Sequence, residues 1–172
     1  MSSYLAGFTA PHSQRPPVPV SVDWKAVEEW LGLRLPDDYK HLADAHGPLD
    51  FGEYLWIHVP CVQEGRFDYG AWLRGTHRQA RIRARELPER ERPAVHPDPG
   101  GLLAWGCTRG SDVLFWDTSV SADPDEWTVV VSHSAGIPGS GLRPWHRYDL
   151  TLGDYLRCTV RAQRPLPSPP VR

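Results

Sequence analysis

A cysteine, a serine and an aspartate lie within six residues in the stretch LLAWGCTRGSDVLFWDT, between two tryptophan-bearing apolar runs. With any of the chain's eight histidines, Cys107, Ser111 and Asp112 provide the residue types of a nucleophilic site. No GxSxG or other nucleophile-elbow pattern surrounds them. The alternative is a hairpin in which TRGSD is the turn, Gly110 supplies a positive φ and the short polar side chains bond the local backbone. The sequence favours the hairpin, with a hydrolase using Cys107 or a histidine as the competing interpretation.

Metal and cofactor chemistry has little support in the residue spacing. The histidines never form HxH, HxxxH or HExxH, so a zinc site would need ligands from distant positions. Neither GxxxxGK[ST] nor GxGxxG occurs as a phosphate cradle. We therefore expect no cofactor and no resident metal.

Two short helices are predicted near the start of the chain. In SVDWKAVEEWLG, apolar residues recur at three- and four-residue steps, and Gly32 suits a helix end. LPDDYKHLADAHG predicts a second helix, with Pro36 at its first position and Gly47 as its stop. Residues 67–85 show a weaker helical pattern. A last helix is predicted in TLGDYLRCTV, where Thr151 and Asp154 have capping-box spacing.

The remaining apolar stretches have the length and composition of strands. YLWIHVP alternates between two faces, one with Leu55, Ile57 and Val59 and the other with Tyr54, Trp56 and His58. LLAWG, DVLFW and WTVVVS are short and rich in β-branched and aromatic residues, and HRYDL is a possible fourth strand of this group. Because DVLFW is apolar at odd and even positions, it is predicted inside the sheet.

This order of elements predicts an α+β fold. We expect a single domain, with a mainly antiparallel sheet of four to six strands flanked by an N-terminal helix pair, a middle helix and a C-terminal helix. The domain is predicted over residues 21–164. Residues 1–20 are predicted as a flexible tail, and residues 165–172 as a proline-rich one. Three cysteines without paired spacing and no long apolar run lead us to expect a soluble cytoplasmic protein.

Charge is distributed unevenly along a chain whose net charge is only −2. Residues 74–92 contain seven arginines, diluted by three glutamates, and a solvated helix is favoured there over a nucleic-acid site because interleaved aromatic residues are missing. Residues 23–68 contain ten acidic and four basic residues, a local charge of −6. An acidic face would attract basic partners, although helix starts and solvated faces explain many such residues equally well.

Several segments together resemble the SUKH superfamily, which includes fungal cell-wall assembly regulators and immunity proteins of bacterial polymorphic toxin systems. They are VEEWLGLRLPDDYKHLADAHG, a strand ending at Pro60, LLAWGCTRGSDVLFWDT, PDEWTVVV and YDLTLGDYLRC, so the resemblance spans about residues 21–160. Its most specific parts are LP-xx-Y, the WG before the polar turn, and FW-D followed by a tryptophan-led strand. The arginine-rich segment and the proline-rich tails depart from the family pattern.

The resemblance implies a non-catalytic α+β domain that binds a partner. In bacterial members the partner is typically a toxin, often a nuclease, so we expect an immunity protein that binds a basic toxin and makes no direct contact with nucleic acid or membrane. An intracellular scaffold or regulator binding a host protein is the alternative. The candidate partner contacts are Asp50, Glu53, Trp56, Glu64 and Asp68. The positions expected to determine the fold are Pro36, Tyr39, Gly47, Trp105, Gly106, Trp116 and Trp127.

Overall fold

The computed structural model describes residues 21–51, 54–60, 68–133 and 144–162. Along the chain the helices and strands are α1 (Trp24–Leu31), α2 (Asp37–His46), β1 (Leu49–Phe51), β2 (Leu55–Ile57), α3 (Tyr69–Ala84), η1 (Glu89–Glu91), β3 (Leu102–Thr108), β4 (Val113–Asp117), η2 (Pro124–Glu126), β5 (Thr128–Ser132), β6 (Trp145–Tyr148) and α4 (Leu152–Ala162). The predicted α+β class is confirmed. Both predicted tails lie outside the described residues.

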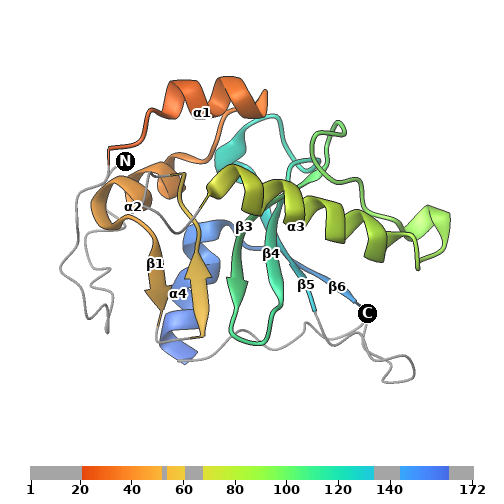
Figure 1. Cartoon of the computed structure of the whole chain (residues 1–172). Helices are drawn as coiled ribbons and strands as arrows, with labels where there is room; N and C mark the ends of the chain where they lie inside the picture. Colours follow the sequence, from red (N-terminus) through yellow and green to blue (C-terminus); the bar gives the residue numbers. More distant parts are fainter. Residues whose placement is uncertain (1–20, 52–53, 61–67, 134–143, 163–172) are drawn as a thin grey trace.

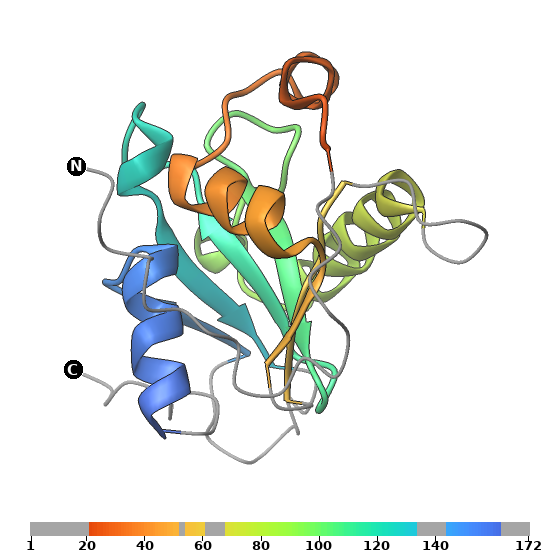
Figure 2. The ribbon, with the colours of Figure 1, turned by 90° about the vertical axis from the view of Figure 1, so that its left-hand side faces the viewer.

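The strands form one antiparallel sheet in the order β1-β2-β3-β4-β5-β6, so each strand pairs with its neighbours in sequence. Helices α2 and α4 cover one face of the sheet and α3 crosses the other, while α1 lies over one end (Figures 1 and 2). As predicted, β4 is an interior strand. The three-residue strand β1 was not predicted, because so short a segment has no readable alternation.

The first two helices begin and end close to the predicted residues. The Asp23 carboxylate accepts a hydrogen bond from the Ala26 backbone N–H at 3.1 Å, and Gly32 ends α1 with a φ of 73°. Gly47 ends α2 with a φ of 66°. Pro36 differs from its prediction by one position: it lies at the N-cap, before the helix, because its ψ of 137° is extended rather than helical.

The core between the sheet and helices α2 and α4 is built from aromatic rings. Trp105 and Trp116 are fully buried, with ring centres 6.0 Å apart. Tyr39 of α2 meets Trp116 edge-on at 5.0 Å, and Tyr155 of α4 meets Trp105 edge-on at 6.2 Å. Trp127 also packs against Trp116, with ring centres 6.3 Å apart. All three tryptophans are therefore buried, and Tyr39 belongs to the same cluster.

A β-bulge interrupts β3 at Trp105. Ala104 pairs with Phe115 and Gly106 pairs with Leu114, so Trp105 is an extra residue on this strand. A Cβ on Gly106 would lie 2.5 Å from the Trp56 carbonyl oxygen of β2, far inside van der Waals contact. The backbones of β2 and β3 therefore approach each other closely at Gly106, and only glycine fits there.

The turn after β3 differs from its prediction in one torsion angle. The Ser111 N–H donates to the Thr108 carbonyl at 3.0 Å, and the Asp112 N–H donates to the Thr108 hydroxyl at 3.1 Å. The positive φ of 66° belongs to Ser111 and not to Gly110. In a three-residue hairpin loop the left-handed residue follows the turn itself, which places it at the third loop position. The hairpin interpretation of TRGSD is confirmed, with this correction.

Helix α3 is attached to the rest of the fold by buried polar contacts. His77 is 4% exposed, and its Nε2 accepts a hydrogen bond from the Ala104 N–H at 3.0 Å. Arg81 donates to the carbonyls of Val95, at 3.0 Å, and His96. Arg83 donates to the His133 carbonyl at 2.7 Å. These contacts hold α3 against β3 on one side and against the end of β5 on the other.

Replacing Gly106 with alanine should destabilise the fold by about 2–3 kcal/mol, because the added methyl group forces β2 and β3 apart. Gly110→Ala is the matched control: its Cβ would meet nothing closer than 3.7 Å, so a change below about 0.5 kcal/mol is expected. Urea unfolding of both variants measures the difference. Equal losses of stability in the two variants would show that the close approach of Gly106 to the Trp56 carbonyl does not require glycine.

His77 should make stability depend on pH. Burial, reinforced by the nearby charges of His96 and Arg81, lowers its pKa from 6.5 to about 3. The unfolded chain therefore takes up the proton first as the pH falls, and stability is lost progressively between pH 6.5 and 3. In His77→Gln, the slope of unfolding free energy against pH across this range should fall by up to about 1.4 kcal/mol per pH unit. An unchanged slope would show that folding does not lower the pKa of His77.

Candidate partner-binding face

One row of side chains crosses all six strands on the face that α3 only partly covers. Directly opposite residues of neighbouring strands share a face of the sheet, so the register places them side by side. The row contains Asp50, Trp56, Cys107, Val113, Ser132 and Trp145, one residue from each strand in order. Asp50 is exposed, Ser132 is buried and the other four are half-buried. We call this set the cross-strand row.

The cross-strand row lies near the β3–β4 turn, beyond the part of these strands that α3 crosses (Figure 1). The next residues on the same face of these strands, Ala104, Phe115 and Val130, are at most 1% exposed beneath α3. The row is therefore where side chains of this face emerge from under the helix.

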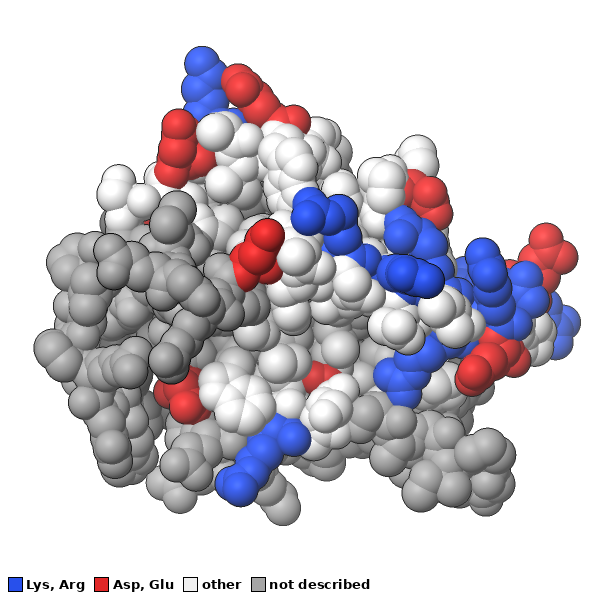
Figure 3. Space-filling view, viewed as in Figure 1, with Lys and Arg blue, Asp and Glu red and all other residues white. Residues whose placement is uncertain are grey.

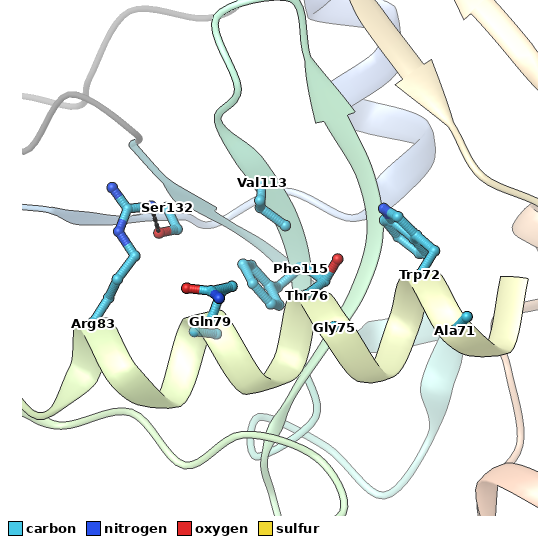
Figure 4. A pocket seen from close by; sticks show the side chains of 10 residues that line it. Ala71, Trp72, Gly75, Thr76, Gln79, Arg83, Val113, Phe115 and Ser132 are labelled. Carbon is cyan, nitrogen blue, oxygen red and sulfur yellow. Dashed lines mark hydrogen bonds between the residues drawn. The ribbon is translucent and has the colours of Figure 1, made fainter.

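A groove of about 380 Å³ lies between the row and α3 (Figure 4). On the sheet side it is lined by Val113, Phe115 and Ser132. On the helix side it is lined by Ala71, Trp72, Gly75, Thr76, Gln79, Ala80 and Arg83. Small residues at the middle of this helix stripe leave the space open, with Trp72 at one end and Arg83, bonded to Ser132, at the other. The volume matches that of a pocket for a small ligand or for one or two side chains.

Cys107 and His58 are the two side chains on this face that most resemble a catalytic cysteine–histidine pair. The Cys107 Sγ lies 3.4 Å from His58 Nε2, and the His58 ring packs on Trp72 with centres 4.1 Å apart. Burial raises the pKa of the Cys107 thiol and lowers the pKa of His58 to about 4. At neutral pH both groups are therefore uncharged, whereas a nucleophilic cysteine needs thiolate character.

The other residues of the nucleophile hypothesis do not join this pair. Asp112 contacts His133, with Oδ2 and Nδ1 3.2 Å apart, and Ser111 lies in the hairpin turn. Within the described ranges, no group of three or more His, Cys, Asp and Glu side chains is arranged to hold a metal ion.

The predicted partner contacts divide into three groups. Asp50 and Trp56 are direct cross-strand neighbours in the row. Asp68 lies apart from them at the N-cap of α3, where its carboxylate accepts the Ala71 N–H at 2.8 Å. Glu53 and Glu64 lie outside the described residues. The sequence missed Val113, Ser132 and Trp145 as members of the row, although two-residue alternation outward from Phe115 identifies Val113.

Several of the described acidic residues between positions 23 and 68 have partners within the fold. Glu28 and Asp37 both pair with Lys40, at 3.1 and 2.9 Å. Asp44 accepts the Trp24 indole N–H at 2.9 Å, and the mostly buried Asp38 accepts the Gly153 N–H at 3.1 Å. Much of the −6 charge in this segment therefore serves helix caps and contacts within the fold.

Comparisons of the chain with protein-family models, with curated proteins and with solved structures found no match. Among the helices described, none has both the length and the apolar character needed to cross a membrane.

The state of Cys107 can be measured by thiol labelling. Because its thiol is half-buried and its pKa is raised, Cys107 should react with iodoacetamide at neutral pH at least about tenfold more slowly than the exposed Cys158. Variants that keep one of these two cysteines, each also with Cys61→Ser, separate the rates. Fast labelling of Cys107 that falls in His58→Ala would instead reveal an activated Cys–His pair and favour the hydrolase.

Proposed function

We propose that this chain is a non-catalytic protein-binding module, and specifically an immunity protein that binds and neutralises a cognate toxin in the producing cell. The observation that carries the proposal is the cross-strand row with its adjoining groove: half-buried Trp56, Val113 and Trp145 beside an open apolar cavity. Aromatic residues next to a pocket are typical of the energetic centre of protein interfaces. The resemblance to the SUKH superfamily supplies the class of partner.

An acidic residue bounds the apolar part of this face. Asp50 ends the row at β1, whereas Asp68 lies apart from it, at the start of α3. Toxins that act on nucleic acid have basic surfaces, because they must hold phosphates. We infer that Trp56 and the groove provide the apolar anchor and that Asp50 steers basic residues of the toxin toward it.

The protonation states of His58 and Cys107 support binding over turnover. An uncharged thiol beside an uncharged imidazole lacks the ion pair that activates cysteine nucleophiles. The same two groups, packed with Trp72, form a half-buried surface that a partner can cover at little desolvation cost.

Capture by the tagged full chain from a lysate of the native organism, followed by co-expression with each captured protein, tests the function. We expect one captured protein whose toxic domain stops growth alone and is tolerated when this chain is present. Trp56→Ala and Asp50→Lys should each weaken binding of that domain by about tenfold or more. Gly75→Leu should also weaken it by filling the groove, without loss of stability, since a Cβ at Gly75 meets nothing within 4 Å.

Glu29→Lys on α1 is the matched control, because its side chain is 69% exposed and lies on another element. Asp68→Ser tests Asp68 separately, because it removes the charge of this residue while keeping an N-cap side chain. If Trp56→Ala, Asp50→Lys and Gly75→Leu all left the affinity for the toxin unchanged, the toxin would not bind this face. Capture of only housekeeping proteins, with no toxicity to relieve, would replace the immunity role with that of a scaffold or regulator.

A further inference from the structure

Helix α3 presents a second surface on the flank opposite the groove. Arg74, Arg78, Arg81 and Arg85 follow one another at steps of four, three and four residues, which places them on one side of the helix. Arg92 folds back beside them, donating to the carbonyls of Leu87 at 2.9 Å and Arg85 at 3.1 Å. We call these five arginines the arginine ridge. Figure 3 shows the basic side chains gathered along α3 and beyond its C-terminal end.

The guanidinium groups of the ridge form no ion pairs with the parts of the protein described here. Within the described ranges, no carboxylate lies within 4.0 Å of a ridge guanidinium; Arg90, outside the ridge, is the arginine near α3 that pairs with a glutamate. Residues Tyr69–Ala84 contain four arginines and no acidic residue. Like charges four residues apart destabilise a helix by about 0.2–0.5 kcal/mol per pair. The helix dipole offsets this near the C-terminus, but it gives no such benefit to Arg74 in the N-terminal half.

An exposed tryptophan lies at the N-terminal end of the ridge. Trp30 of α1 is 51% exposed, the largest exposed fraction among the bulky apolar side chains described. Its ring comes within 3.7 Å of the point that a Cβ on Gly70 would occupy, and the Arg74 guanidinium lies 3.1 Å from the same point. Tryptophan and arginine are, with tyrosine, the residues enriched at the energetic centres of protein interfaces.

We propose that the arginine ridge and Trp30 form a docking site for a short acidic segment of a protein partner, with an apolar side chain of that segment packing on Trp30. The inference goes beyond toxin neutralisation and does not rest on it. Guanidinium groups bind carboxylates in a bidentate geometry, and their spacing along one helix suits successive acidic side chains.

The charges around the ridge set the size of its occupant. From Arg74 to Arg85 the helix rises roughly 17 Å, the length of about five extended residues. Asp68 precedes Arg74, and Glu86, Glu89 and Glu91 follow Arg85 in the chain, so carboxylates lie beyond both ends of the stretch from Arg74 to Arg85. A long polyanion would meet these carboxylates, whereas a short acidic segment fits between them. A single aromatic ring at one end also falls short of the row of rings that stacks the bases of single-stranded RNA.

The test uses three fluorescent probes and the full chain, with binding followed by anisotropy at low and moderate salt. The probes are a short peptide of glutamates around one leucine, the same peptide with glutamine in place of glutamate, and an oligouridine. We expect the acidic peptide to bind most tightly, the glutamine peptide not to bind, and salt to weaken the complex.

Variants locate the site. Arg78→Glu and Arg85→Glu should each weaken binding of the acidic peptide by about threefold to tenfold, while Lys25→Glu should leave it unchanged. Lys25→Glu makes the same change of charge as the ridge variants, and a glutamate suits the first turn of α1. Thermal melts check that each variant folds. Trp30→Ala should weaken the leucine-containing peptide but not an all-glutamate peptide. Tighter binding of oligouridine, equal loss in Lys25→Glu, or no binding of the acidic peptide would each overturn the proposal.

Discussion

The β-bulge at Trp105 determines which side chains reach each face of the sheet. Side chains alternate strictly along a strand, so one extra residue reverses the face of everything that follows it. Without the bulge, Cys107 would point toward α4 instead of toward α3. With it, Trp105 enters the aromatic core, Gly106 passes under the Trp56 carbonyl, and Cys107 joins Trp56 and Val113 on the other face. The core and the candidate partner-binding face therefore depend on the same irregularity.

Helix α3 divides its arginines between two tasks. Arg81 and Arg83 donate to backbone carbonyls of distant segments and anchor the helix, one on each flank. Arg74, Arg78 and Arg85 are exposed and have no carboxylate partner in the described part of the chain. Small residues on the groove side, such as Gly75, leave space that larger residues would fill. One helix thus combines anchoring with two chemically different surfaces, apolar on one flank and cationic on the other.

Local patterns predicted most of the elements but not their contacts. The bounds of α1 followed from periodicity and from Gly32, and the interior position of β4 followed from its apolar residues on both faces. The approach of His58 to Cys107 was beyond prediction, because it depends on a strand register and a bulge that join residues 49 positions apart. The anchoring role of Arg83 depends on a carbonyl 50 residues away. The arginine-rich segment that contains Arg83 was predicted only as a solvated helix. A count of acidic residues likewise could not show that Glu28 and Asp37 share Lys40.

The sequential strand order has a consequence for how the chain acquires its structure during synthesis. Each strand pairs with the one made just before it, so the sheet has low contact order and can assemble hairpin by hairpin as the chain emerges. The contact between α2 and α4 is different: Asp38 meets the Gly153 N–H across 115 residues. Until α4 has been made, the face of the sheet that carries Trp105 and Tyr148 lacks one of its two covering helices. Closure of the aromatic core therefore has to wait for α4, and the nascent chain exposes apolar surface to chaperones until that helix docks.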